Sequence, residues 1–430
     1  MAKDVHPPRG MRDFLPLEKS RREIVLTQIR ETYLSHGFQE IETPALEDLA
    51  RLTSGQGGDN EKLAFRVMKR GEEFDKAFAA GMASTVTAES QDLLESDDDG
   101  FSPTDSLADL GLRFDLTVPL TRYYATNRAK LPNVFKALQI GPVWRAERPQ
   151  KGRYRQFVQC DIDIIGDSSE LAEIELLNAS LDALAAIGVE NATIRINHRA
   201  LLTSLIDQLG VPESGRGQAM IIIDKLDKIA AQGVANELAD KFGSGVAKKA
   251  TAWLDSIEGN LAAPAELASI FAAIEARHGA GRLRFDPTLV RGMGYYTGAI
   301  FEIEHPQSGS SIGGGGRYDG MVGRWLGTDA PAVGISIGFE RVVDLLEQPA
   351  DAEQKSVVLV LANPGSTVIG NALNLQQQAI EAGYRVRLEA MPKKLNILLD
   401  QMLENGFTAF ATVNEESINF SQLELRSLSK

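Results

Sequence analysis

Apolar positions near the start of the chain recur with the period of a helix. Three of them are spaced three and four apart: Leu26, Ile29 and Tyr33. A helix buries such a stripe on one face, and Gly37 follows where helices commonly end, because glycine tolerates a positive φ. The pattern therefore predicts a helix over 17–36. A short strand-like run comes next, and Pro44 stops it.

Strand-type sequence dominates residues 112–166, where β-branched and aromatic residues lie between Gly and Pro. A helix ending at Gly188 is predicted next, because five apolar residues fall on one face: Leu171, Ile174, Leu177, Leu181 and Leu184. Residues 200–283 are rich in Ala, Leu and Lys and predict a helical insertion, after which strand-type sequence resumes at 288. The strands are not spaced as βαβ units, so we expect an α+β fold on a mainly antiparallel sheet.

Three further stretches differ in character. Residues 73–108 combine small residues, Ser and Thr with an ESDDDG run and weak periodicity, which predicts an exposed insert. Residues 346–356 are polar and contain Pro, as is typical of a linker. Beyond them, an apolar run of buried-strand type at 357–362 opens an alternation of strand and helix patterns. This alternation predicts a separate βαβαββ unit over 357–430.

The acidic balance of the chain narrows the classes of function. Asp and Glu number 59 against 45 Lys and Arg, a formal net charge of −14, which argues against a protein that coats nucleic acid through a general basic surface. Cys160 is the only cysteine and the five histidines lack ligand spacing, so we expect neither disulfides nor a protein-bound metal. No apolar run approaches the ~18 residues that span a bilayer, and the N-terminus lacks an apolar leader region. We therefore expect a cytoplasmic protein with no membrane contact.

Residues 144–157 hold the densest cluster of basic residues in the chain. Five basic residues stand against the single acid Glu147, a local balance of five minus one: Arg145, Arg148, Lys151, Arg153 and Arg155. On charge alone the segment is either a solvated hairpin loop or a polyphosphate clamp. The second interpretation follows from arginine chemistry, because guanidinium groups bind phosphate oxygens bidentately and keep their charge at any working pH.

Two other arginines lie in apolar or glycine-rich segments. Arg291 follows Leu-Val and precedes several glycines, and Arg341 ends a strand-like run. An unpaired charge in such surroundings is costly, so we expect each to have an anionic or aromatic partner. The glycine-rich run at 313–320 lacks the GK[ST] of a P-loop and opens no βαβ unit. It predicts backbone that lies close to a ligand or to another strand.

Polar residues alternate in the strand-type run around Cys160. Gln159, Asp161 and Asp163 share one face of the predicted strand, where they either meet solvent or line a polar pocket. Cys160 points to the other face with no histidine near it in sequence, so we expect a packed, unreactive thiol.

These segments, in this order, resemble the motifs of the class II aminoacyl-tRNA synthetases. The first motif is similar to 37–44, the second to 144–157 and the third to 334–342. Two more segments, 289–298 and 313–320, are similar to the histidine-specific signatures of the histidyl-tRNA synthetase family. The sequences RGMRDFLP near the N-terminus and IDKLDKI in the helical insertion also resemble this family, so the resemblance covers nearly the whole chain except 73–108.

The resemblance implies ATP-dependent activation of L-histidine to histidyl-adenylate, followed by transfer to histidine tRNA. Arg145 and Arg291 would be catalytic, on either side of the α-phosphate, and Arg145 would also reach the histidine carboxylate. For ATP, Glu147 would bind the adenine edge and Arg153 the γ-phosphate. The adenine ring would stack between Phe157 and Arg341. Mg²⁺ would arrive with ATP.

For histidine, the resemblance implies a second set of residues. Asp115 and Thr117 would hold the α-amino group. The imidazole nitrogens would be bound by Gln159 and Asp163, together with a group of tyrosines: Tyr295, Tyr296 and Tyr318. An analogue lacking a ring nitrogen would leave buried polar groups unpaired, which gives discrimination on the order of 10⁴ without editing.

The resemblance also implies a domain plan. A catalytic domain would cover 1–345 with the helical insertion at about 200–283, a linker 346–356, and an anticodon-binding-like α/β domain 357–430. The Pro44 segment implies a homodimer. Gly294 stands where the family signature usually has Asp, and Lys393 and Lys394 are candidate tRNA contacts.

Two functions other than histidine activation are the alternatives. One is a catalytically inactive paralogue that serves as a regulatory subunit of ATP phosphoribosyltransferase. Such paralogues generally lose the ATP-binding arginines and the C-terminal domain, whereas this chain keeps Arg145, Arg291, Arg341 and the βαβαββ pattern. The other is a different class II synthetase, which would need an amino-acid pocket unlike the one that 289–298 and 313–320 imply.

Overall fold

The computed structural model describes residues 5–53, 63–88, 107–149, 152–257, 261–291, 295–346 and 355–428. The chain forms two compact units. The large unit comprises Met1–Arg12 with Leu26–Leu346, and the small unit comprises Asp13–Val25 with Glu347–Lys430. Helix α1 (Pro16–Ser35) contributes residues to both, and its bounds confirm the helix predicted over 17–36.

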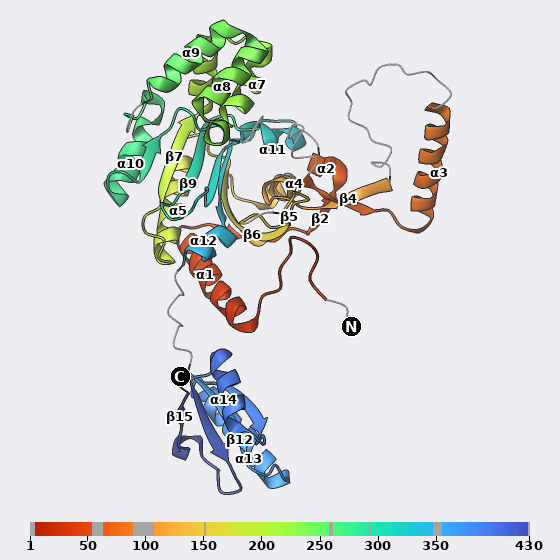
Figure 1. The fold of residues 1–430 in the computed structure, drawn as a ribbon, viewed down its shortest axis with the longest axis vertical. Coiled ribbons are helices and arrows are strands. Elements are labelled where there is room, and N and C mark those ends of the chain that lie inside the picture. The colour runs from red at the N-terminus through yellow and green to blue at the C-terminus, as the bar shows by residue number, and fades with distance from the viewer. Residues whose placement is uncertain are drawn as a thin grey trace. The chain divides into compact units, whose positions relative to one another are not determined.

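An eight-stranded sheet forms the centre of the large unit (Figure 1), in the order β1-β5-β6-β11-β10-β9-β7-β8. Neighbouring strands are antiparallel except for the pairs β1–β5 and β7–β8 at its two edges. This arrangement confirms the predicted α+β fold on a mainly antiparallel sheet. The strands are β1 Gln39–Glu40, β5 Phe135–Trp144, β6 Gln156–Ile165, β7 Thr193–His198, β8 Leu283–Phe285, β9 Ala299–Glu304, β10 Gly313–Arg317 and β11 Ala332–Gly338.

The two faces of this sheet differ in chemistry. On β6, Cys160, Ile162 and Ile164 are fully buried, and α5 (Leu171–Ala186) packs against β6 and β11. The alternating residues Gln159, Asp161 and Asp163 therefore lie on the opposite face. The apolar face forms the core, and the polar face is available for a site.

A second sheet has three strands in the order β2-β4-β3. These strands lie between β1 and β5 along the chain. They are β2 Leu46–Asp48, β3 Phe65–Met68 and β4 Ala108–Leu112. Helix α2 (Leu49–Thr53) follows β2 in the chain, and helix α3 (Gly71–Ala88) follows β3. The first part of the insert expected at 73–108 thus forms a helix, contrary to its weak apolar periodicity, while 89–106 lies outside the described residues.

Helix α4 (Thr117–Asn127) corrects a second expectation, because it begins within 112–120, which was predicted to be strand-type. The chain leaves β4, and the Asp115 carboxylate accepts a hydrogen bond of 3.1 Å from the Val118 amide. This bond satisfies a backbone donor at the start of the helix. Pro119 falls in the first turn, where proline is tolerated.

The segment predicted to be a helical insertion contains five α-helices in the described residues. They are α6 Arg199–Leu209, α7 Arg216–Ile223, α8 Leu226–Phe242, α9 Ser244–Asp255 and α10 Ala268–His278. Leu202, Ile206 and Leu238 are among the buried residues of one apolar cluster that joins α6, α7, α8 and α9, whereas α10 packs against α5. The remaining helices of the large unit are α11 (Asp319–Leu326) and α12 (Phe339–Leu345).

The small unit has the predicted βαβαββ order. Its sheet runs β13-β12-β14-β15, with β13 and β14 parallel to β12 and β15 antiparallel to β14. Side chains alternate on β12, so Val357 and Leu359 pack with α13 whereas Val358 and Val360 pack with α14. The elements are β12 Ser356–Leu361, α13 Ser366–Glu381, β13 Arg385–Ala390, α14 Leu395–Glu404, β14 Ala409–Val413 and β15 Arg426–Ser427.

Candidate active site

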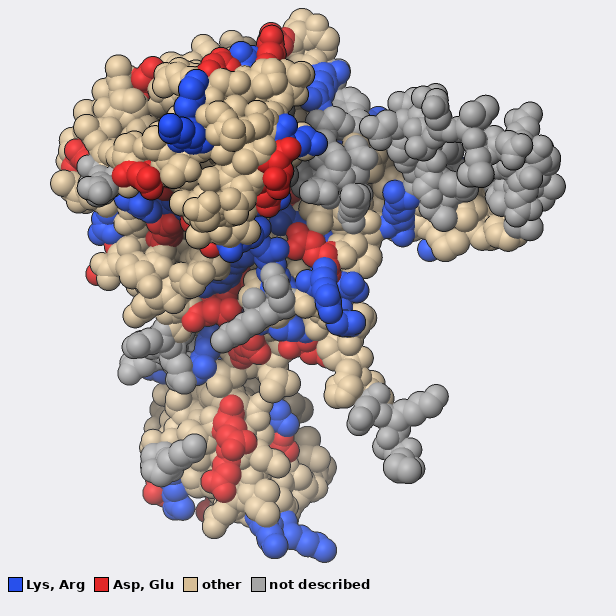
Figure 2. Space-filling view, turned by 45° about the horizontal axis from the view of Figure 1, so that its top comes forward, with Lys and Arg blue, Asp and Glu red and all other residues tan. Residues whose placement is uncertain are grey.

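A cleft of about 760 Å³ lies over the polar face of the large sheet. Every residue that the family resemblance assigns to ATP or histidine lines it, although these residues come from widely separated parts of the chain. They are Asp115, Thr117, Arg145, Glu147, Arg153, Phe157, Gln159, Asp163, Arg291, Tyr295, Tyr296, Tyr318 and Arg341. On the face of the large unit seen in Figure 2, basic and acidic side chains are intermixed.

Arginines from three segments converge on the cleft. Burial lowers the pKa of Arg341, and the neighbouring positive charges of Arg153, Arg291 and Arg145 lower it further. Like charges held this close repel one another, and an anion placed among them relieves that repulsion. The cleft is therefore electrostatically suited to a polyanionic ligand.

Arg145 and Phe157 face each other across the β5–β6 hairpin. The Arg145 guanidinium carbon lies 5.0 Å from the centre of the Phe157 ring, a cation–π geometry. Arg145 Nε also donates a 3.0 Å hydrogen bond to the Phe114 carbonyl. These contacts fix the orientation of the guanidinium within the cleft.

In the hairpin between β5 and β6, some charged residues of 144–157 line the cleft and others do not. Arg153 lines the cleft and pairs with Glu147 at 3.5 Å. Arg155 instead braces the loop, since its Nε donates to the Glu147 carbonyl at 2.9 Å and its amide donates to the Gly10 carbonyl at 2.8 Å. Arg148 is exposed and does not line the cleft, and Lys151 lies outside the described residues.

Arg291 has the anionic partner that the sequence predicted. Its Nη1 donates to Glu302 Oε2 at 2.8 Å and to the Gly313 carbonyl at 3.2 Å. A Cβ added at Gly314 would overlap this same nitrogen, so the glycine-rich strand β10 provides the space in which Arg291 lies. Gly294, at the departure from the family signature, lies outside the described residues.

Arg341 differs from this expectation. Its Nη1 donates to the carbonyl of Ser311, so its partner in the described residues is a backbone dipole and neither a carboxylate nor a ring. The carbonyl satisfies a donor without neutralising the charge. Arg341 consequently adds its full positive charge to the cleft.

The floor of the cleft is a row of buried polar groups on β6 and β11. Gln159 Nε2 donates to Ser336 Oγ at 2.9 Å, while Gln159 Oε1 and Asp161 Oδ1 are buried and have no hydrogen-bond partner among the described residues. Burial, and then the nearby charge of Asp163, raises the pKa of Asp161 well above its usual range. Unpaired buried acceptors are costly, and a ligand with N–H donors would satisfy them.

Asp163 lies next along this floor. Tyr318 Oη donates a 2.6 Å hydrogen bond to its Oδ1. Burial raises the pKa of Asp163 to about 7, although the Tyr318 hydrogen bond lowers it. A Cβ at Gly334, directly opposite Asp163 on β11, would overlap the carboxylate, so this glycine makes room for it.

Several cleft residues were not singled out from the sequence. Asp161 lies on the predicted polar face but was given no role, and Ser336 and Glu340 lie in the segment similar to the third motif without a role of their own. Glu302 lies in none of these motifs. The one available sign for Glu302 is its place in AIFEIE, where acids alternate with apolar residues along a strand. Three residues of the DKLDK segment also line the cleft: Asp224, Asp227 and Lys228.

Neither a metal-binding cluster nor a membrane-spanning helix is present in the part of the chain that the structure describes. No group of three or more His, Cys, Asp or Glu side chains there is placed to hold a metal ion. No described helix is both long and apolar enough to cross a membrane.

Comparisons with known proteins point to one family. A family model described as histidyl-tRNA synthetase matches residues 84–342. The histidine–tRNA ligase of Leifsonia xyli subsp. xyli is 52% identical to this chain over 97% of each sequence. The crystal structure of histidyl-tRNA synthetase from Nostoc sp. PCC 7120 has a TM-score of 0.68 at 26% identity and covers 95% of this chain and 91% of its own.

One further solved structure shares the fold. A protein from Bacillus halodurans described as an ATP phosphoribosyltransferase regulatory subunit/histidyl-tRNA synthetase has a TM-score of 0.72 at 19% identity. It covers 95% of this chain and 97% of its own. At this identity the likeness shows the fold alone.

Proposed function

Because the chain belongs to the histidyl-tRNA synthetase family, we propose that it is a histidine–tRNA ligase. It would activate L-histidine with ATP, release diphosphate, and transfer the histidyl group to the 3′ end of histidine tRNA. The observation that carries the proposal is the convergence of four arginines on one cleft whose floor holds unpaired buried acceptors. A polyanion and a small ligand with N–H donors fit the two halves of this cleft.

Activation requires positioning and charge neutralisation more than covalent chemistry by the protein. An oxygen of the histidine carboxylate attacks the α-phosphorus, and the bond from that phosphorus to the bridging oxygen of diphosphate breaks. Negative charge develops on the phosphate oxygens in the transition state, so Arg145 and Arg291 would act as catalytic residues that stabilise it from two sides. Their fixed orientation in the cleft supports this role, because preorganised charges need no rearrangement during the reaction.

The remaining polar residues of the hairpin would bind the rest of ATP. Arg153 would contact the γ-phosphate, and Glu147 would accept a hydrogen bond from the adenine amino group. The adenine ring would stack between Phe157 and Arg341. Mg²⁺ would enter as part of MgATP, held mostly by the phosphate oxygens of ATP.

Histidine would lie on the floor formed by β6 and β11. Asp115 and Thr117, at the start of α4, would hold the α-ammonium group. Gln159 and Asp163, together with Tyr295, Tyr296 and Tyr318, would form the imidazole pocket. The Oε1 of Gln159 has no partner among the described residues, which supports its role as an acceptor for a ligand N–H.

We propose that the large unit catalyses both steps and that the βαβαββ unit binds the tRNA. Lys393 and Lys394 support the second assignment, because both are exposed immediately before α14. The protein would act in the cytoplasm as a homodimer formed through the Pro44 segment. The domain plan would be the catalytic domain 1–345, the linker 346–356 and the tRNA-binding domain 357–430.

The regulatory paralogue is the less supported alternative. The Bacillus halodurans protein shares the fold, but a regulatory subunit has no need for catalytic arginines. In this chain Arg145, Arg291 and Arg341 all line the cleft. A different class II synthetase is likewise less supported, since the family match is to histidyl-tRNA synthetase.

Charging of tRNA tests the proposal. Purified protein, ATP with Mg²⁺, labelled L-histidine and a transcript of histidine tRNA should yield acid-precipitable histidine on the tRNA. Omitting ATP, or substituting a transcript of another tRNA, should abolish the product. Histidine binding by calorimetry without any charged tRNA would instead support the regulatory alternative.

A further inference from the structure

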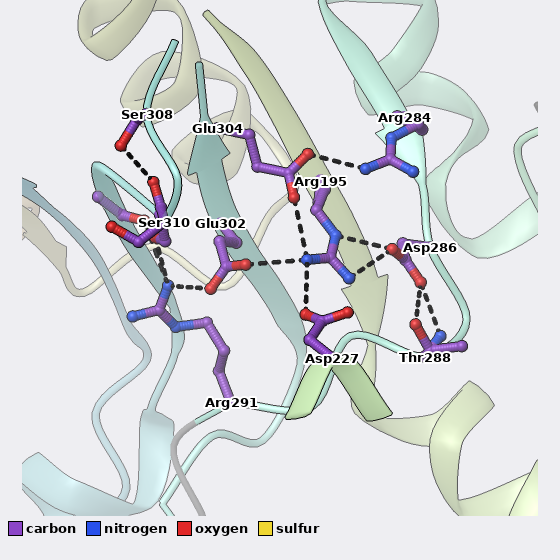
Figure 3. A network of polar contacts seen from close by, with 12 residues as sticks. Arg195, Asp227, Arg284, Asp286, Thr288, Arg291, Glu302, Glu304, Ser308 and Ser310 are labelled. Atoms are coloured by element: carbon purple, nitrogen blue, oxygen red, sulfur yellow. Dashed lines mark hydrogen bonds and ion pairs between the residues drawn. The ribbon is translucent and has the colours of Figure 1, made fainter. Parts of the chain in front are cut away.

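A network of ion pairs lies directly behind Arg291 (Figure 3). Glu302 on β9 joins two arginines, because its Oε2 accepts from Arg291 Nη1 at 2.8 Å and its Oε1 accepts from Arg195 Nη1 at 3.0 Å. Arg195 lies on β7 directly opposite Glu302 in the antiparallel register. One carboxylate thus connects the arginine of the cleft to a second arginine outside it.

Arg195 does not line the cleft, and its surroundings are acidic. Only 8% of its surface is exposed. It pairs with Asp286 at 2.7 Å and with Glu304 at 3.0 Å, and Asp227 of helix α8 lies 3.8 Å away. Burial lowers the pKa of Arg195, but Asp286, Glu304 and Glu302 raise it, and the net direction is upward. Arg195 therefore stays charged and holds several carboxylates together that would otherwise repel one another.

Among the residues that the structure describes, Arg291 is held through one of its nitrogens. The Nη1 atom makes all the hydrogen bonds found for this side chain among the described residues, with Glu302, the Gly313 carbonyl and Ser311 Oγ. The guanidinium also lies against Gly314, which is opposite Glu302 in the sheet register. The direction in which Arg291 presents its other nitrogen atoms is consequently set by the position of the Glu302 carboxylate.

We infer that Arg195 is a positioning residue for Arg291: by fixing the charge and orientation of Glu302, it aims Arg291 at the α-phosphate. The inference rests on the proposed function. It predicts that Arg195 affects the chemical step although it touches neither ATP nor histidine. A purely structural ion pair between β7 and β9 would stabilise the sheet without this effect.

The test uses Arg195→Lys, which keeps the charge but cannot bind Asp286 and Glu302 with one rigid fork. We expect kcat for histidine-dependent diphosphate exchange to fall about tenfold, as misplacement of a catalytic group does, with KM for ATP and histidine nearly unchanged. The matched control is Arg284→Lys. Arg284 pairs with Glu304 at 2.8 Å in the same network but does not contact Glu302, so its kcat should stay at the wild-type value.

A double-mutant cycle separates positioning from structural support. In an Arg291→Ala background, Arg195→Lys should cause no further loss of kcat, because the residue that it positions is absent. If the fold-losses of kcat in the two single variants multiply in the double variant, the inference is overturned. A wild-type kcat in Arg195→Lys alone would overturn it as well. If Arg195→Lys does not fold, Glu302→Gln takes its place, with the same expected loss and the same dependence on Arg291. A wild-type protein without exchange would overturn the proposed function itself, and this inference with it.

Discussion

Tyr318 Oη donates a hydrogen bond of 2.6 Å to Asp163 Oδ1 on the buried floor of the cleft. The bond favours the ionised carboxylate, whereas burial favours the neutral acid, and the pKa of Asp163 is about 7 as a result. Both oxygens of Asp163 are free of a proton, and so able to accept from an imidazole N–H, only when the carboxyl group is ionised. Its protonation state is therefore linked to histidine binding near neutral pH.

A first prediction concerns the pH dependence of KM for histidine. KM should fall as pH rises through about 7, because the carboxylate form of Asp163 becomes populated above its pKa. Tyr318→Phe removes a hydrogen bond that lowers this pKa, so its inflection should move to higher pH. Free histidine titrates in the same range, but it does so equally for both proteins. The informative quantity is therefore the difference in inflection pH between wild type and Tyr318→Phe. Identical inflection pH values for the two proteins would contradict histidine binding by Asp163.

A second prediction concerns Arg291. Arg291→Ala should lower the rate of adenylate formation by about 10² or more, because it removes a charge that acts chiefly on the transition state. Histidine binding measured by calorimetry should remain largely intact. Diphosphate exchange within a few-fold of wild type would refute the catalytic role of Arg291.

A third prediction concerns the close approach of β11 to Asp163. Gly334→Ala adds a Cβ that overlaps the Asp163 carboxylate, so the carboxylate must move. We expect KM for histidine to rise at least about tenfold, since a buried polar contact is lost or misplaced. Gly320→Ala is the matched control, because its added Cβ has no atom within 4 Å. Equal KM values for the two variants would argue against histidine binding at Asp163.

A fourth prediction concerns assembly. Pro44 is exposed between β1 and β2, and we expect its segment to join two copies of the chain about a twofold axis. Analytical ultracentrifugation at micromolar concentration should give the mass of a dimer. A monomer under those conditions would refute the proposed homodimer.

The sequence predicted much of the fold where local patterns agree with the tertiary structure. Both faces of β12 are buried, and the resulting apolar run at 357–362 predicted a buried strand. Helix α4 was missed because its first turn contains Val118 and Pro119, which indicate strand and turn when read locally. Its start depends on the Asp115 hydrogen bond to the Val118 amide, which apolar periodicity does not report.

The site was predictable as far as charge and motif spacing extend. Arg145 and Arg153 were recognised because they concentrate positive charge in an acidic chain. Glu302 and Arg195 were not, because their pairing depends on the register of β7 with β9. Contacts between residues 107 positions apart arise from sheet topology, and a single sequence does not display them.

Histidine-dependent exchange of labelled diphosphate into ATP tests the central claim most directly. The purified protein should catalyse exchange with L-histidine and show no exchange with the other protein amino acids. Only the side chain of histidine would form hydrogen bonds both with the polar groups of β6 on the floor of the cleft and with the tyrosines around them. Arg284→Lys and Gly320→Ala should behave as wild type in the same assay. A folded protein that shows no exchange with histidine, or exchange with another amino acid instead, would contradict the assignment of this cleft as a histidine-activating site.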